Sequence, residues 1–213
     1  MKIYGFPLSP FVRKTLLALA EKGIAYDLVP TNPQQPSEEF SACSPFNKIP
    51  AMDDDGFKLA DSTAIITYLD AKHPANPLLP AEPQARGRAV WFEEVSDTVL
   101  VPAGAGMVVN RFLRPRIFGA PGDEEAAQAS EEAVKKPLAY LENAVSDQWL
   151  GSEFSVGDLA VGSVMKTLSY AGWQLDPGTY PRLSAWFERI KARPSWGKVE
   201  SQEQAIFAAA GLS

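Results

Sequence analysis

The stretch from Tyr4 to Lys14, YGFPLSPFVRK, decides how the N-terminal part of this chain folds. A short apolar segment over residues 2–6 runs through a Gly and Pro break into Ser9 and Pro10, and serine followed by proline is a common helix start. Beyond it, apolar side chains recur with the spacing of one buried helix face, at Val12, Leu16, Leu19 and Ala20. The stretch therefore predicts a strand followed by a helix that begins at Pro10.

The residues that follow extend this pattern into a strand–helix–strand unit. Gly23 stands where a helix C-cap glycine is expected, and residues 25–29 have the composition of a second strand. Because such crossovers are right-handed, the two strands are predicted to pair in parallel. Ser9 then lies at the C-terminal edge of a small sheet, where open α/β sheets tend to bind their ligands.

The rest of the N-terminal part reads as an irregular Pro-rich stretch over residues 31–36, a short helix near Cys43, and a β-hairpin. The hairpin segment, IPAMDDDGFKLADS, places its turn at Asp55-Gly56 and leads into a helix over 61–72. Four prolines between residues 73 and 84 then forbid a continuous helix, which predicts an extended linker.

Every long segment after the linker has helical character. Helices are predicted over residues 86–114, 123–146, 155–170 and 181–192, with a short one after Pro194. A bend or break is expected near Pro102, a kink at Pro137, and a capping box at Ser155–Asp158. We predict an α/β domain over residues 1–75, a Pro-rich linker over 76–84 and an all-α domain over 85–213.

Composition excludes several classes of function. The net charge of -6 disfavours nucleic acid as the main partner, and no apolar run reaches the about 18 residues that a membrane span needs. The N-terminus lacks the apolar core of a signal peptide, and the single cysteine, Cys43, rules out an intramolecular disulfide. These features predict a cytoplasmic protein with no membrane or nucleic-acid partner.

The repertoire of reactive side chains is equally restrictive. The one histidine, His73, falls at a predicted helix end, so a Ser-His-Asp triad and a His/Cys metal site are both disfavoured. The acidic run 53–55 is interpreted as a solvated turn, and neither nucleotide-binding glycine motif is present. No metal is therefore expected, and Ser9 has no base to make it a nucleophile.

Ser9 can still act as a hydrogen-bond donor. A helix N-terminus with a hydroxyl favours a bound anion, and a thiolate is one such anion. Lowering a thiol pKa from about 8.5 by about two units takes about 2.7 kcal/mol. A hydrogen bond to a charged group supplies about 1.5–3 kcal/mol and the helix dipole about 0.3–1 kcal/mol, so one serine is quantitatively enough.

Several stretches together resemble a soluble glutathione transferase of the serine type, similar to the phi and theta-like bacterial branches. They are PLSPFVRK, SPFNKIPAM, LADSTAIITYLDAKHP, the Pro linker, FSVGDLAVG and YPRLSAWFERIKARPSW. The resemblance covers nearly the whole chain. It implies a thioredoxin-like N-terminal domain that binds glutathione, a helical domain with a pocket for a hydrophobic electrophile, a homodimer, and a role in detoxification.

The resemblance also assigns roles to single residues. Ser9 matches the serine that hydrogen-bonds the glutathione sulfur, with Arg13 part of the same pattern; the alternative is a plain N-cap. Ile49-Pro50 matches the loop, with a cis proline, whose backbone pairs with the cysteinyl part of glutathione; otherwise Pro50 is a proline at an edge strand.

Two further groups of residues are assigned to the ends of glutathione. Asp61 and Ser62 match the pair that holds the γ-glutamyl end, and the alternative is an ordinary helix cap. Lys48 and, more loosely, Gln35 match residues near the glycyl carboxylate, where Lys48 is otherwise one more solvated charge.

The second substrate is less well defined by the sequence. Its pocket is expected to draw on five residues, although such side chains at helical spacing are more often core: Phe11, Val101, Met107, Asn110 and Phe112. The Ala-rich tail over 204–213, with Phe207, either covers this pocket or frays. Cys43 is expected to be buried and away from Ser9.

The expected function is addition of the glutathione thiolate to a small hydrophobic electrophile. Conjugation, dehalogenation, peroxide reduction and double-bond isomerisation all start from that thiolate and stay open. The alternatives outside enzymology are a transferase-like module that binds proteins, and a protein that stores or transports apolar ligands.

Overall fold

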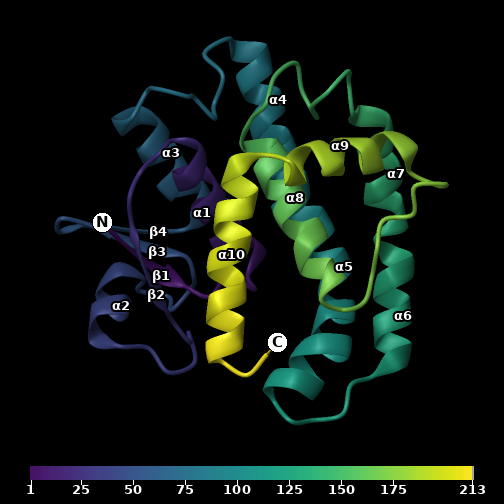
Figure 1. The fold of residues 1–213 in the computed structure, drawn as a ribbon, viewed down its shortest axis with the longest axis horizontal. Coiled ribbons are helices and arrows are strands. Elements are labelled where there is room, and N and C mark those ends of the chain that lie inside the picture. The colour runs from purple at the N-terminus through teal and green to yellow at the C-terminus, as the bar shows by residue number, and fades with distance from the viewer. Residues whose placement is uncertain (213) are drawn as a thin grey trace.

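A four-stranded mixed sheet forms the N-terminal part of the computed structural model, which describes residues 1–212 (Figure 1). The strands are β1 (Lys2–Gly5), β2 (Asp27–Pro30), β3 (Ala51–Asp54) and β4 (Phe57–Ala60), in the spatial order β2-β1-β3-β4. β1 pairs with β2 in parallel and with β3 antiparallel, and β3 pairs antiparallel with β4. The predicted parallel pair is confirmed, with β2 starting two residues later than expected.

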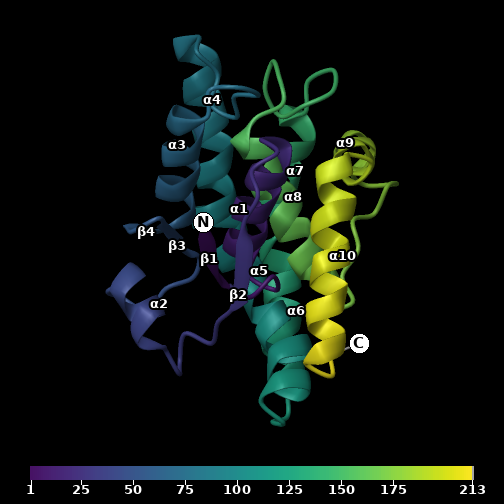
Figure 2. The ribbon, with the colours of Figure 1, turned by 60° about the vertical axis from the view of Figure 1, so that its left-hand side comes forward.

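Helices cover both faces of the sheet, as Figure 2 shows for α2 on one side and α1 with α3 on the other. These helices are α1 (Pro10–Glu21), α2 (Glu38–Cys43) and α3 (Ser62–Lys72). Alternation along β1 sends Ile3 into the core with α1 and α3, and Tyr4 into a smaller cluster with Phe40 of α2. Gly5 is required for this packing, because a Cβ there would lie 2.6 Å from a methyl group of Val12.

The hairpin forms where the sequence places it. Asp55 and Gly56 both have positive φ, at 52° and 96°, as a tight turn of this kind requires. The acidic run over residues 53–55 was expected to be solvated, and this is wrong for Asp54. It is buried and accepts hydrogen bonds from Tyr68 and Lys72 of α3, so it ties the sheet to that helix.

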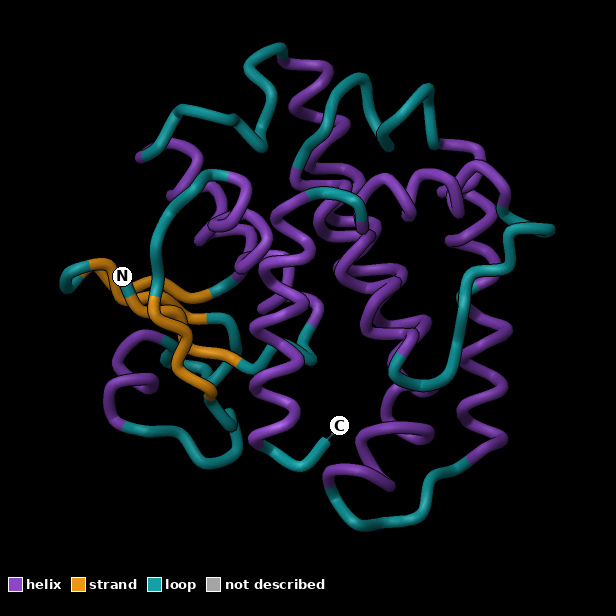
Figure 3. Tube along the Cα trace, viewed as in Figure 1, coloured by secondary structure: helices purple, strands orange, loops and turns teal. Residues whose placement is uncertain are grey.

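The second part is all helical (Figure 3). Its segments are α4 (Pro83–Glu94), η1 (Val95–Leu100), α5 (Val101–Val108), η2 (Val109–Ile117), α6 (Glu124–Ala133), α7 (Lys135–Ala144), α8 (Val156–Ser169), α9 (Pro181–Lys191) and α10 (Pro194–Ala209). Together with the sheet domain this confirms the predicted fold class, α/β followed by a helical bundle. No helix among residues 1–212 is long and apolar enough to cross a membrane.

The first long helix of this part does not break at Pro102, which leaves only the bend of the expected bend or break. α4, η1, α5 and η2 follow one another without a gap, and the winding changes to π instead. Pro102 has no N–H to give to the carbonyl four residues earlier. The wider turn pairs the N–H of Val101 with Ser96 O, five residues back, and Phe118 makes the same pairing with Leu113 beyond Pro115.

The other proline and capping predictions hold. The helix over 123–146 is divided at Val134, one turn before Pro137, whose missing N–H leaves a carbonyl in the preceding turn without its donor. The capping box is present at the start of α8, where the buried Asp158 carboxylate accepts from Ser155 N, Leu150 N and Trp186 Nε1 at 2.8–3.0 Å.

The C-terminal helix is longer than predicted. α10 runs for 16 residues, because its far half is packed rather than free. Phe207 is buried, and its ring stacks on that of Phe6 with centroids 5.7 Å apart. The expected tail is therefore helical to Ala209, and Ser213 lies outside the described residues.

Candidate functional site

The topology gathers three chain segments at one edge of the sheet. β1 ends at this edge and leads into Ser9, while its antiparallel neighbour β3 begins there, directly after Pro50. β4 runs antiparallel to β3 and returns to the same edge, where Ala60 pairs with Ala51 and Asp61 follows. Residues far apart in the sequence therefore meet around the end of β1 and β3, and the N–H of Asp61 lies 3.3 Å from Pro50 O.

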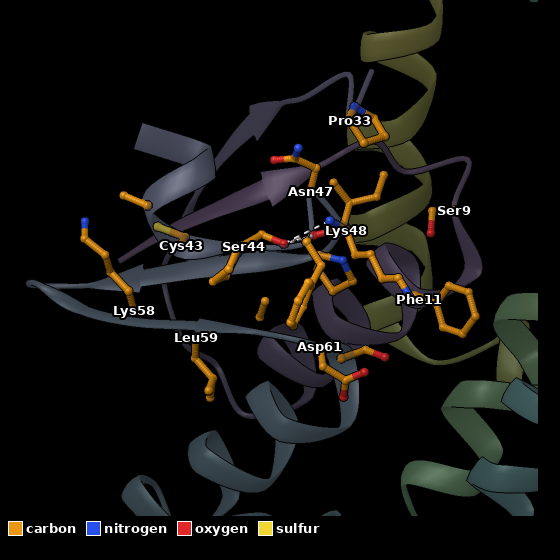
Figure 4. A pocket seen from close by; sticks show the side chains of 17 residues that line it. Ser9, Phe11, Pro33, Cys43, Ser44, Asn47, Lys48, Lys58, Leu59 and Asp61 are labelled. Atoms are coloured by element: carbon orange, nitrogen blue, oxygen red, sulfur yellow. Dashed lines mark hydrogen bonds between the residues drawn. The ribbon is translucent and has the colours of Figure 1, made fainter. Parts of the chain in front are cut away.

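An open cavity of about 940 Å³ lies along this edge (Figure 4). Ser9 and Phe11 stand at one end of it, and Cys43 and Lys58 at the other. The lining residues are Ser9, Phe11, Pro33, Ala42, Cys43, Ser44, Pro45, Phe46, Asn47, Lys48, Ile49, Pro50, Lys58, Leu59, Ala60, Asp61 and Ser62. A cavity of this size can hold an extended tripeptide-sized ligand.

Ser9 is the N-cap of α1 and is half-buried at the cavity wall. Its Oγ accepts from the N–H of Val12 at 3.4 Å, a long contact that leaves the hydroxyl proton free. Its own N–H donates to Phe6 O at 3.0 Å. Ser9 can therefore cap the helix and donate to a bound anion at the same time.

The loop before β3 is closed by Ser44. The Ser44 hydroxyl donates to Lys48 O at 2.8 Å and accepts from Lys48 N at 2.9 Å, which fixes the turn that leads into the cavity wall. The Ile49-Pro50 peptide bond is cis, as the resemblance implies.

Asp61, the N-cap of α3, and Ser62, its first residue, line the same cavity. Asp61 has a φ of +81°, a conformation rare for a residue with a side chain, and such residues concentrate at ligand sites. One of its carboxylate oxygens, Oδ1, accepts from Thr63 N at 2.9 Å and from Ala64 N at 3.1 Å. The other oxygen has no hydrogen bond within residues 1–212, so the cap leaves it available to a cation in the cavity.

The predicted glutathione residues are brought together with one exception. Lys48, Ile49, Pro50, Asp61 and Ser62 all line the cavity with Ser9. Gln35 does not line the cavity: its side chain is exposed, and its N–H closes a turn on Asn32 O at 3.0 Å. The nearby residue that does reach the cavity is Pro33.

Of the five residues expected around the second substrate, only Phe11 lines this cavity. Met107 is fully buried in the core, and Phe112 is buried in a cluster with Leu8 and Phe207, so neither presents a free surface. Asn110 is engaged within its own helix and its neighbour, donating to Gly106 O and accepting from Asp123 N.

Val101 is half-buried and packs against the core, outside the cavity. Helical spacing alone could not separate a pocket side chain from a core side chain here, because the winding changes to π on either side of α5.

Cys43 is buried as predicted, but it lines the same cavity as Ser9, at the far end. Burial raises the pKa of its thiol, with the charges of Lys58 and Asp53 nearby.

The sequence analysis missed Asn47 and Lys58 as cavity residues. For Asn47 the available signal was the turn-forming run Ser44-Pro45-Phe46-Asn47. Residues 1–212 contain no group of three His, Cys, Asp or Glu side chains that could hold a metal ion.

Fold and cavity define a two-part protein with an open cavity at its sheet edge, and comparison with known proteins identifies the family. Residues 3–77 match the glutathione S-transferase N-terminal domain and residues 124–189 the glutathione S-transferase C-terminal domain. The chain is 32% identical over 207 residues to glutathione S-transferase 3 of Zea mays, covering 93% of this chain and 92% of the relative. This chain belongs to the glutathione S-transferase family of enzymes, which use glutathione as co-substrate.

Solved structures agree with this assignment. A glutathione S-transferase of Rhodospirillum rubrum F11 superposes with a TM-score of 0.86 at 26% identity, covering 93% of this chain and 90% of that one. A structure of glutathione S-transferase-I bound with lactoylglutathione gives a TM-score of 0.82 at 26% identity, covering 94% and 98%.

Proposed function

We propose that the cavity binds glutathione and that Ser9 lowers the pKa of its thiol, so that the thiolate adds to a small hydrophobic electrophile. The observation that carries this proposal is the free hydroxyl proton of Ser9 at the start of α1, in one cavity with Pro50 and the start of α3. The related structure bound with lactoylglutathione, a glutathione derivative by its name, supports glutathione as the ligand.

Each part of the ligand finds a complementary group. The peptide groups at Ile49 and Pro50 pair with the cysteinyl part of glutathione. The N–H of Ser62 at the start of α3 receives the γ-glutamyl carboxylate, and the free oxygen of Asp61 faces the ammonium. Lys48, exposed beside the cavity, pairs with the glycyl carboxylate. This arrangement sets the thiol toward Ser9.

In the reaction the thiol proton leaves to solvent, because no histidine lines the cavity. The Ser9 hydroxyl donates a hydrogen bond to the thiolate left behind, and the helix dipole adds to its stabilisation. The thiolate sulfur then forms a bond to the electrophilic carbon. In a substitution the electron pair of the broken bond leaves with the departing group, and in an addition it moves onto the adduct, which takes a proton from solvent. Phe11, at the Ser9 end, contributes apolar surface for that substrate.

The proposal extends to the assembly and setting of the protein. Phe46, on the cavity rim, is 85% exposed, the largest value among the exposed large apolar side chains of residues 1–212. A second copy of the chain that covers it forms a homodimer, the state typical of the family. The proposal also puts the domain boundary at the linker over 76–84 and assigns the protein to the cytoplasm and to detoxification.

The direct test is a titration of the bound thiol. Ultraviolet difference spectra of glutathione bound to wild-type protein, taken from about pH 5 to 10, are expected to show a thiol pKa well below the free value of about 8.5. In Ser9→Ala the pKa of the bound thiol is expected to return close to the free value, with little change in glutathione affinity. A wild-type thiol that titrates like free glutathione would exclude this mechanism and favour the protein-binding alternative.

A further inference from the structure

A buried arginine lies one helical turn beyond Ser9 and does not face the cavity. Arg13 is 2% exposed, and the acceptors around its guanidinium come from α8 and α10 of the helical domain and the residue after α8. Nε donates to Glu203 Oε2 at 3.0 Å, Nη1 to Ser163 O and Thr167 Oγ1 at 3.1 and 2.9 Å, and Nη2 to the Tyr170 hydroxyl at 3.0 Å and to Glu203. All five N–H groups of the fork are therefore paired.

Thr167 continues this network to the residue that precedes Ser9. Its hydroxyl accepts from Arg13 and lies 3.1 Å from both Leu8 O and Ser163 O. Ser163 O accepts from Arg13 and, in the backbone ladder of α8, from the N–H four residues later, which uses both of its lone pairs, so the single Thr167 proton goes to Leu8 O.

Leu8 O belongs to the same planar peptide group as the N–H of Ser9. That N–H donates to Phe6 O at 3.0 Å, so both polar atoms of the peptide that leads into Ser9 are fixed, one by the loop itself and one by α8. A rotation of this peptide would turn the Ser9 side chain away from the cavity, and the Thr167 bond opposes that rotation.

We propose that Arg13 and Thr167 are positioning residues that hold the Ser9 hydroxyl in register with the bound thiol. The inference rests on the proposed function, because the group they position is the donor to the thiolate. Through them the helical domain contributes to thiol activation without touching glutathione. Glu203 supplies the countercharge that allows the guanidinium to stay buried at this point.

A purely structural role for the network is the competing explanation, and the chain offers a matched control. Glu21, at the far end of α1, accepts from Arg193 at the start of α10 at 2.6 and 2.7 Å. That pair joins the same two helices as Arg13 and Glu203 but lies at the end of α1 away from Ser9. Glu21→Gln therefore weakens the α1–α10 contact without reaching the Leu8–Ser9 peptide.

The test measures the pKa of the bound glutathione thiol in Thr167→Val, Thr167→Ser and Glu21→Gln, with circular dichroism to confirm folding. Thr167→Val keeps the side-chain volume and removes the hydroxyl; we expect the thiol pKa to rise by about one unit, a tenfold loss of thiolate at a pH well below both pKa values. The conservative Thr167→Ser and the control Glu21→Gln are expected to keep the wild-type pKa. Activity of Thr167→Val should recover above its raised pKa, with glutathione affinity unchanged.

A double variant separates positioning from general loosening. If Thr167 acts through Ser9, then Thr167→Val adds nothing to the thiol pKa in a Ser9→Ala background. A second double variant, Arg13→Met with Glu203→Leu, removes both charges of the buried pair and leaves no unpaired ion. We expect it to raise the pKa of the bound thiol as Thr167→Val does.

The possible results are distinguishable. If Thr167→Val leaves the pKa of the bound thiol unchanged, or shifts it equally in the wild-type and Ser9→Ala backgrounds, the positioning role is overturned and the proposed function stays intact. If the thiol pKa of glutathione bound to the wild-type protein is not lowered, both the positioning role and the proposed function are overturned.

Discussion

At the scale of single residues, two helix-capping side chains of the site keep part of their hydrogen-bonding capacity unused by the cap. Ser9 caps α1 through a lone pair and keeps its proton, while Asp61 caps α3 through one oxygen and keeps the other. Capping and the proposed ligand contact are compatible because they use different atoms or lone pairs of one side chain. A capping pattern in the sequence is therefore compatible with a ligand role.

The two tasks of Asp61 can be separated by substitution. Asp61→Asn keeps an oxygen for Thr63 N and Ala64 N but loses the charge for the glutathione ammonium, so we expect about tenfold weaker glutathione binding with little change in melting temperature. Asp61→Ala should lose the cap as well, about 0.5–2 kcal/mol of stability. Calorimetric binding and thermal melts check both, and equal binding by Asp61→Asn and wild type would contradict the ammonium contact.

At the scale of elements, α1 is fixed to α10 at both ends. Arg13 and Glu203 join them near Ser9, and Glu21 joins Arg193 and Ser195 at the other end. Lys14 adds a buried link from α1 to Glu93 and Asp97 of α4 and η1. The helix that carries Ser9 is thus tied to the helical domain by buried or half-buried ion pairs along its length.

The distal pair predicts a pH dependence of stability. Burial disfavours the charged form of Glu21, yet hydrogen bonds from Arg193 and Ser195 outweigh it and lower the pKa of Glu21 below its ordinary value. A lowered folded-state pKa means that the unfolded chain binds the proton more readily. The stabilisation is present above the unfolded value of about 4.3 and is lost as the pH falls through the folded value.

Glu21→Gln removes this contribution at every pH. At pH 7 we expect its melting temperature to lie about 2–4 °C below wild type, which corresponds to about 1 kcal/mol in a chain of this size. The difference should shrink as the pH falls below about 4, which melting curves from pH 7 to 3 can follow. A constant difference across that range would contradict the lowered pKa.

At the scale of the whole molecule, the exposed Phe46 lies on the rim of the open cavity. If a second copy covers Phe46, burial of each ring stabilises the dimer by about 1.5–3 kcal/mol. Two-fold symmetry buries two such rings, so the contribution is doubled. We expect Phe46→Ser to weaken the dimer about 100-fold or more, measured by analytical ultracentrifugation over a dilution series.

Phe57→Ser is the control for the dimer prediction. Phe57 is also exposed, at 48%, but its ring already packs on Tyr68 with centroids 4.7 Å apart. We expect this variant to dimerise like wild type. A wild-type protein that sediments as a monomer at every concentration would refute the homodimer.

Local signals determined much of this protein. Ser9-Pro10, Asp55-Gly56 and the Ser155–Asp158 box mark their helix starts and turn correctly, because caps and tight turns depend on the conformation of a few adjacent residues. The order of these signals also predicted the two-part fold, and the family resemblance assigned to glutathione six residues, of which all but Gln35 share one cavity with Ser9.

The tertiary structure alone decided what depends on distant contacts. Met107 and Phe112 belong to the core rather than to a pocket, and α10 extends because Glu203 and Phe207 find partners nearly 200 residues earlier in the chain. The network from Arg13 through Thr167 to Leu8 is of the same kind. No spacing along the sequence encodes such contacts, since they form only when packing brings separate helices together.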